Sequence, residues 1–149
     1  MNIQLETIPE TRIAYVRRTG PYGPENALAM EQLKQWAREQ GLMQGPAVIL
    51  GIPQDNPAIT PPEHCRYDAC ISLPEHPPAD TSVTYGVLPG GTYAVVTIAH
   101  TAEAVQQAWA EILPALSHSG YMLDQQRPVI ERYKEDLVSR HLCELCFPV

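Results

Sequence analysis

The sequence predicts an α+β domain that contains the same structural module twice. A turn that runs into an apolar strand at Pro9–Val16 lines up, eighty positions later, with a second one at Pro89–Val96. In both halves a helical pattern follows and stops at a glycine, Gly41 in the first half and Gly120 in the second. Since 149 residues make one ordinary domain, these observations predict a tandem duplication of a strand-strand-helix-strand-strand module within a single domain.

The first half begins with a predicted hairpin, in which Ile3 and Leu5 precede a turn and the strand Arg12–Thr19 follows it. The helix is expected to begin at Pro24, because proline suits the first helical position. A proline-rich loop, residues 53–64, separates the last two predicted strands, which are Ala47–Ile52 and Cys65–Leu73.

The second half follows the same order, with a predicted hairpin of Val83–Val87 and Tyr93–Ala99. Thr101 can cap the next helix, whose apolar residues recur at helical spacing. Pro114 lies inside this helix and predicts a kink, because proline removes one backbone hydrogen bond. Two strands complete the half, at Val129–Tyr133 and Leu142–Phe147.

Two copies of this module are expected to associate, because a four-stranded antiparallel sheet with one main helix covers only one of its faces. The predicted domain spans residues 1–149, with repeats at about 1–75 and 80–149 related by a pseudo-twofold axis. A groove between the repeats is the expected ligand site. The alignment places Glu131 where the first copy has Leu50, which predicts one charged wall and one apolar wall.

Composition and charge exclude several classes of protein. No stretch is long and apolar enough to cross a membrane and the chain starts without a leader pattern, so we expect a cytoplasmic protein with no membrane partner. A formal charge of −7 argues against direct nucleic-acid binding. The four cysteines are expected to be thiols, and the lone pair Cys143 and Cys146 predicts no metal site. No motif predicts a cofactor.

The motif Asp55-Asn56-Pro57-Ala58-Ile59-Thr60-Pro61-Pro62-Glu63-His64-Cys65-Arg66-Tyr67-Asp68 resembles the signature of the GyrI-like proteins and the effector-binding domains of AraC-type transcription activators. Three further segments support the resemblance, namely Gly90–Val95, the helix around Trp109, and Pro128–Tyr133, the last of which is similar to the family pattern P-x-x-E-x-Y. The resemblance runs over the whole chain. It implies two strand-helix-strand modules with a ligand groove between them.

The resemblance also implies functions. In relatives the carboxylate at the position of Glu131 lies in the groove among aromatic residues and meets cationic or amphipathic ligands. Some relatives are described as DNA gyrase inhibitors or as ligand-binding modules joined to a helix-turn-helix. A subgroup hydrolyses cyclopropane-bearing DNA-alkylating toxins with this glutamate. We expect this chain to act as a free-standing module.

Five residues are the candidate ligand contacts, and three of them have a structural alternative. Glu131 provides the charge, or else it faces solvent or pairs with Arg12, Arg66 or Arg132. Trp109 lines the groove or packs against its own sheet. Tyr22 shapes the site or only forms a turn. Tyr67 and Tyr133 complete the set, since their rings can pack while their hydroxyl groups reach a ligand or, for Tyr133, hold the Glu131 carboxylate.

Three functions are compatible with these residues. The favoured one is a module that binds a small amphipathic, cationic or aromatic molecule. The second is a hydrolase of cyclopropane-bearing genotoxins, with Glu131 as general acid or base. The third is an inhibitor that binds DNA gyrase through its acidic surface.

Overall fold

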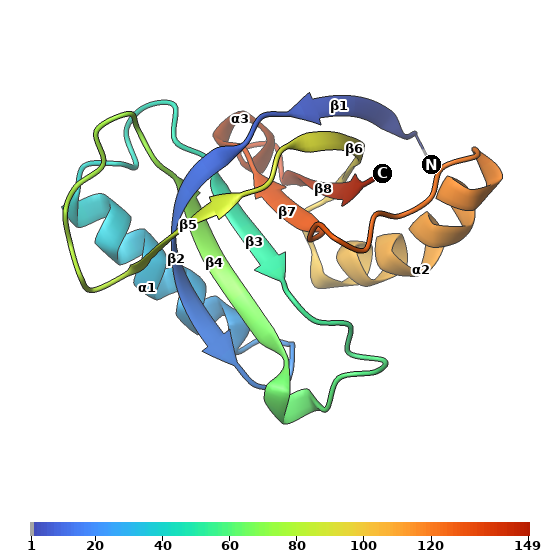
Figure 1. Ribbon diagram of the computed structural model, residues 1–149, viewed down its shortest axis with the longest axis horizontal. Coiled ribbons are helices and arrows are strands. Elements are labelled where there is room, and N and C mark those ends of the chain that lie inside the picture. The colour runs from blue at the N-terminus through green and yellow to red at the C-terminus, as the bar shows by residue number, and fades with distance from the viewer. Residues whose placement is uncertain (1) are drawn as a thin grey trace. The chain divides into compact units, whose positions relative to one another are not determined.

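The computed structural model describes residues 2–149, which form two compact units. One unit consists of residues 10–89 and is called here the continuous unit. The other combines residues 2–9 with residues 90–149 and is called the interrupted unit. In Figure 1 the blue strand β1, at the start of the chain, therefore lies beside β6, from the second half of the chain.

The continuous unit is an antiparallel sheet with one helix on it. Its strands are in the order β5-β2-β4-β3. The helix packs against β2 and β4 through Ala29, Leu33, Trp36 and Ala37. The elements are β2 (Thr11–Thr19), α1 (Asn26–Glu39), β3 (Ile49–Pro53), a 3-10 turn (Pro62–His64), β4 (Arg66–Ser72) and β5 (Thr84–Leu88).

The interrupted unit repeats this plan, with strands in the order β1-β6-β8-β7. Its core lies between α2 and one face of the sheet, where Ile112 and Leu116 meet Leu145 and Phe147. We call this surface the α2 face. The elements are β1 (Gln4–Ile8), β6 (Gly91–Ala99), α2 (Ala102–His118), β7 (Ile130–Tyr133), α3 (Glu135–Val138) and β8 (Leu142–Pro148).

The predicted α+β class and order of elements are confirmed, with shifts at the ends of some elements. Thr101 caps α2, since its hydroxyl oxygen accepts a hydrogen bond from the backbone N–H of Ala104 at 3.1 Å. The first helix begins two residues later than predicted, because Pro24 and Glu25 form a turn before Asn26. The short helix α3 follows β7 and was not predicted.

The two predicted hairpins are wrong. Strand β1 pairs with β6 and not with β2, and β5 pairs with β2 and not with β6. The reason lies in the two-residue connections, Pro9-Glu10 and Pro89-Gly90. Tight hairpins of this length need a positive φ at the first loop residue, whereas proline holds φ near −65°. Each first strand of a predicted hairpin therefore pairs with a strand from the other half of the sequence.

The strand registers also correct the alignment of Glu131 with Leu50. Both units use the same register, because Leu5 lies opposite Ala94 and Tyr85, eighty positions after Leu5, lies opposite Ala14. In the interrupted unit Glu131 lies opposite Leu145. When the strand pairs of the two units are matched, the residue of the continuous unit at the position of Glu131 is Gly51, which lies opposite Ala69. Leu50 corresponds to Ile130. The position that carries the carboxylate in one unit thus has no side chain in the other.

Candidate functional site

Strand β7 presents different residues on its two faces. Ile130 and Arg132 are buried, whereas Glu131 and Tyr133 are half-buried. Because directly paired residues share a face and Glu131 pairs with Leu145, the Glu131 side chain lies on the α2 face. Tyr133, two residues further on, lies on the same face. A carboxylate and a phenol therefore border the apolar core of the interrupted unit.

The charge of Glu131 acts on the neighbouring strand. Cys143 in β8 is buried, and burial raises the pKa of its thiol to about 11, with further contributions from the carboxylates of Glu131 and Glu144. The thiol consequently stays protonated at neutral pH. Glu131 therefore lies close enough to Cys143 to influence its thiol, and its own side chain is half-buried.

Two aromatic side chains lie on the same face. The ring of Tyr133 is 5.1 Å from that of His100, which stands at the end of β6. Trp109 of α2 meets Phe147 edge-on, with ring centroids 5.3 Å apart and an angle of 77° between the ring planes. Trp109 is half-buried and packs against the core. The structural alternative for Trp109 thus holds at least in part, and its contact with a ligand stays a prediction.

The other two candidates belong to the continuous unit. Tyr67 is a buried residue of β4. The Tyr22 hydroxyl donates a hydrogen bond to the Arg66 carbonyl at 2.6 Å and accepts one from the Asp55 N–H at 3.0 Å. Tyr22 thereby fastens the loop after β2 to the loop after β3, and burial raises its pKa. Participation of Tyr22 and Tyr67 in a site with Glu131 stays a prediction.

The three arginines that were alternatives for pairing with Glu131 have other acceptors. Arg12 donates to the carbonyl oxygens of Pro74 and Glu75 at 3.2 and 2.7 Å. Arg66 pairs with Asp55 at 2.9 Å. Arg132 binds carboxylates on the opposite side of β7 from Glu131, as described next.

A buried charge cluster lies behind Glu131 and was not predicted. Arg132, which is 7 % exposed, donates to both carboxylate oxygens of Glu6 at 2.7 and 2.9 Å and to Glu144 at 2.9 Å. Lys134 is 3.5 Å from the same Glu144 oxygen. The hydrogen bonds from Arg132 lower the pKa of Glu6. One sequence signal was available, namely a glutamate in the middle of the buried strand β8.

The four cysteines are free and buried. Burial raises the pKa of Cys146 to about 12 and that of Cys70 further still, so these thiols are unreactive at neutral pH. Within residues 2–149, no three histidine, cysteine or acidic side chains lie close enough to hold a metal ion. No helix of the described chain is long and apolar enough to span a membrane.

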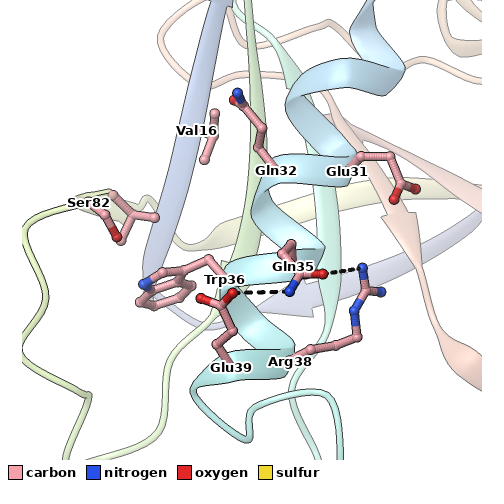
Figure 2. A pocket seen from close by; sticks show the side chains of 9 residues that line it. Val16, Glu31, Gln32, Gln35, Trp36, Arg38, Glu39 and Ser82 are labelled. Carbon is pink, nitrogen blue, oxygen red and sulfur yellow. Dashed lines mark hydrogen bonds between the residues drawn. The ribbon is translucent and has the colours of Figure 1, made fainter.

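The continuous unit carries an open hollow of about 600 Å³ beside α1, shown in Figure 2. We call it the α1 hollow. Its polar rim is ordered by two hydrogen bonds, from Gln35 to Glu39 at 3.0 Å and from Arg38 to Gln35 at 3.3 Å. The lining residues are Val16, Glu31, Gln32, Gln35, Trp36, Arg38, Glu39, Ser82 and Val83.

Trp36 forms part of the wall of the α1 hollow. Its indole N–H is buried and makes no hydrogen bond of ordinary geometry within residues 2–149. The pKa of Asp80 is lowered by hydrogen bonds from the hydroxyl and backbone N–H of Ser82 and, to a smaller degree, by this indole N–H. Trp36 therefore points toward the loop that precedes β5.

A smaller hollow of about 230 Å³ lies on the interrupted unit, and Glu6 and Glu144 are among its lining residues. It belongs to the charge cluster of Arg132. None of the five candidate contacts lines this hollow or the α1 hollow.

Comparison with known proteins identifies the class of protein. The model of the GyrI-like small molecule binding domain matches residues 1–149. This chain therefore belongs to the GyrI-like family.

Two curated relatives carry different names. The SPbeta prophage-derived putative transcriptional regulator YosT of Bacillus subtilis (strain 168) is 43% identical over 150 residues, which cover 100% of this chain and 99% of YosT. A DNA gyrase inhibitor of Pectobacterium carotovorum subsp. carotovorum (strain PC1) is 29% identical over 125 residues, covering 81% of this chain and 79% of the inhibitor.

Solved structures show the same fold. EcmrR, in a complex with DNA, superposes with a TM-score of 0.75 at 17% identity, over 99% of this chain and 56% of the EcmrR chain. SAV2435 bound to tetraphenylphosphonium superposes with a TM-score of 0.62 at 15% identity, over 100% of this chain and 94% of SAV2435. At these identities the likeness concerns the fold alone.

Proposed function

We propose that this chain binds an amphipathic cation and that Glu131 meets the positive charge. The observation that carries the proposal is the placement of a half-buried carboxylate on the α2 face, beside the buried Leu145 and Cys143. A carboxylate withdrawn from water gains more from a cation than an exposed one, because the solvent screens the pair less. A ligand with a charged end and an apolar body suits such a surface.

Aromatic rings on the same face support a cationic ligand. Tyr133 contacts His100 and lies on the same face of β7 as Glu131, and Trp109 packs against the core of the interrupted unit. Each ring that faces a cation is worth about 0.5 to 2 kcal/mol. Ring contacts and one carboxylate together favour a soft, delocalised cation over a small hydrated ion.

The test uses tetraphenylphosphonium, the cation bound to SAV2435. At 100 times its dissociation constant, this ligand should add about 2.7 kcal/mol of stability, or a rise of about 5 to 10 °C in Tm for a domain of this size. Tetraphenylborate has a similar shape and the opposite charge, so it should give no rise. A comparable rise with both ions would show that shape alone governs binding and would overturn the assignment to Glu131.

A second candidate is inhibition of DNA gyrase. It is favoured by the 29% identical relative named as a gyrase inhibitor and by the formal charge of −7, which suits a basic target. A supercoiling assay at low salt should show inhibition that weakens as salt rises. Unchanged supercoiling at an excess of the protein would remove this candidate and leave the small-molecule proposal unaffected.

The hydrolase alternative stays a prediction and is tested separately. Incubation with a cyclopropane-bearing alkylator would yield a ring-opened product if Glu131 acts as general acid or base. The Glu131→Ala variant is the control, and equal product from both proteins would reject hydrolysis by this residue.

A further inference from the structure

Strand β5 forms an edge of the sheet of the continuous unit. In the described chain it pairs with β2 and lies at the end of the strand order, so one side of its backbone is unpaired. Natural edge strands are normally protected against pairing with another chain by charged residues, prolines or bulges. The strand Thr84–Leu88 contains no charged residue and no proline. Its backbone is therefore available to a further strand.

The face of β5 that carries Tyr85 and Val87 is partly exposed, and the Tyr85 hydroxyl is hydrogen-bonded to Pro78 and Asp80 of the loop before β5. Tyr85 lies opposite Ala14 in the ladder, so Tyr85 and Val87 point to the same face as Ala14 and Val16. Val16 and Val83 line the α1 hollow. Because α1 packs on β2 and β4, Tyr85 remains 40% exposed and Val87 55% exposed.

The α1 hollow adjoins the start of this strip, because Val83, the residue before β5, is one of its lining residues. Figure 2 shows Trp36 extending from α1 toward the side on which Ser82, from the loop before β5, lies. An extended peptide can add as a strand to a free sheet edge and insert alternate side chains into an adjoining hollow.

The charges of this region favour a basic partner. Glu31 and Glu39 are exposed on the rim of the hollow, and Asp80 lies in the adjoining loop. Two basic residues lie in this region and both have acceptors: Arg38 on the rim donates to Gln35, and Arg12, opposite Val87, donates to the carbonyl oxygens of Pro74 and Glu75. The chain as a whole has a formal charge of −7, so a peptide with basic residues is attracted and a second copy of this chain is repelled.

We propose that the outer edge of β5 and the α1 hollow form a docking groove for an extended segment of another protein. This segment has basic residues at its ends and apolar residues at alternate positions between them. The segment adds to β5 through its backbone, and its apolar side chains cover Tyr85 and Val87. This surface lies in the continuous unit and does not include Glu131. The proposal therefore goes beyond small-molecule binding, and neither proposal depends on the other.

The test is a titration followed by NMR, with the capped peptide Lys-Val-Thr-Val-Thr-Val-Lys as the probe. Binding should shift the backbone amides of residues 83–88 and the indole N–H of Trp36, while the indole N–H of Trp109 stays in place. A peptide of the same sequence with N-methyl groups on alternate amides should bind at least about tenfold more weakly, because it cannot complete the strand ladder. Equal binding of the methylated peptide, or no shifts at about 1 mM of the parent peptide, would overturn the proposal.

A pair of variants locates the groove. Val87→Lys places a like charge on the exposed edge and should weaken binding about tenfold or more. The matched control is Thr7→Lys, at the corresponding exposed position of β1, which should bind as the parent does. Equal loss in both variants would contradict a site on β5. Sedimentation of the parent as a dimer that Val87→Lys dissociates would also overturn the proposal, since the edge would then be occupied by a second copy.

Discussion

The replacement of Arg132 by methionine tests how much the interrupted unit depends on its buried charge cluster. Arg132 makes three hydrogen bonds to two carboxylates, and Glu144 is only 8% exposed. Methionine retains much of the apolar volume and removes the charge. The variant leaves Glu144 buried without its guanidinium partner.

The size of the effect follows from this geometry. Breaking a buried ion pair from one side typically costs about 3 to 5 kcal/mol. Lys134, 3.5 Å from a Glu144 oxygen, partly replaces the lost charge. Glu6 contributes little to the loss, because its side chain is 41% exposed and regains water. We expect a loss near the lower end, about 3 kcal/mol in the free energy of unfolding.

Urea denaturation at pH 7 measures this loss. With an m-value of about 1 to 3 kcal/mol per molar urea, the midpoint should fall by about 1 M or more. The double variant Arg132→Met/Glu144→Gln should recover part of the stability, since the uncompensated charge is removed. A loss under about 1 kcal/mol for the single variant, or no recovery in the double variant, would refute this account of the cluster.

Three other predictions concern pH, fragments and backbone strain. The folded state holds the pKa of Glu6 below its ordinary value of 4.5, so this carboxylate stabilises the fold above pH 4.5 and loses the contribution as pH falls through the lowered pKa. Urea titrations at a series of pH values should show that Glu6→Gln loses less stability in acid than the parent does. An equal loss of stability in both proteins would contradict the pairing of Glu6 with Arg132. Residues 10–89 contain a whole unit, so this fragment should fold and give a dispersed amide NMR spectrum, whereas fragment 1–80, which lacks β5, should not. The reverse result would contradict the pairing of β5 with β2. Gly91→Ala should lower the free energy of unfolding by about 1 to 3 kcal/mol, because φ is +149° and the new methyl group would lie 2.3 Å from Arg127; thermal unfolding equal to that of the parent would argue against this strain.

Local signals in the sequence were sufficient for most of the fold. The N-cap at Thr101, the spacing of apolar residues in α2 and the alternation in β2 and β6 each reflect interactions within one element. Such patterns do not specify which strand pairs with which. Pro9 and Pro89 indicated the correct pairing, because a proline at the first position of a two-residue connection disfavours a tight hairpin between the strands on either side.

The candidate site was predictable only in part. Strand alternation correctly separated Glu131 from Arg132 on the two faces of β7. The comparison of Glu131 with Leu50 failed, because a one-residue shift in register moves a side chain to the other face of a sheet. The Arg132 cluster joins Glu6 to a residue 126 positions away, and no local pattern encodes such a contact.

The central claim is that Glu131 supplies the charge for a cationic ligand, and the affinity for tetraphenylphosphonium tests it most directly. Isothermal titration of the parent and of Glu131→Gln measures the change, with Glu135→Gln as a control that removes the same charge from an exposed position of α3. We predict that Glu131→Gln binds at least about tenfold more weakly, equivalent to about 1.4 kcal/mol, and that Glu135→Gln binds as the parent does. Equal dissociation constants for the parent and Glu131→Gln would contradict the claim.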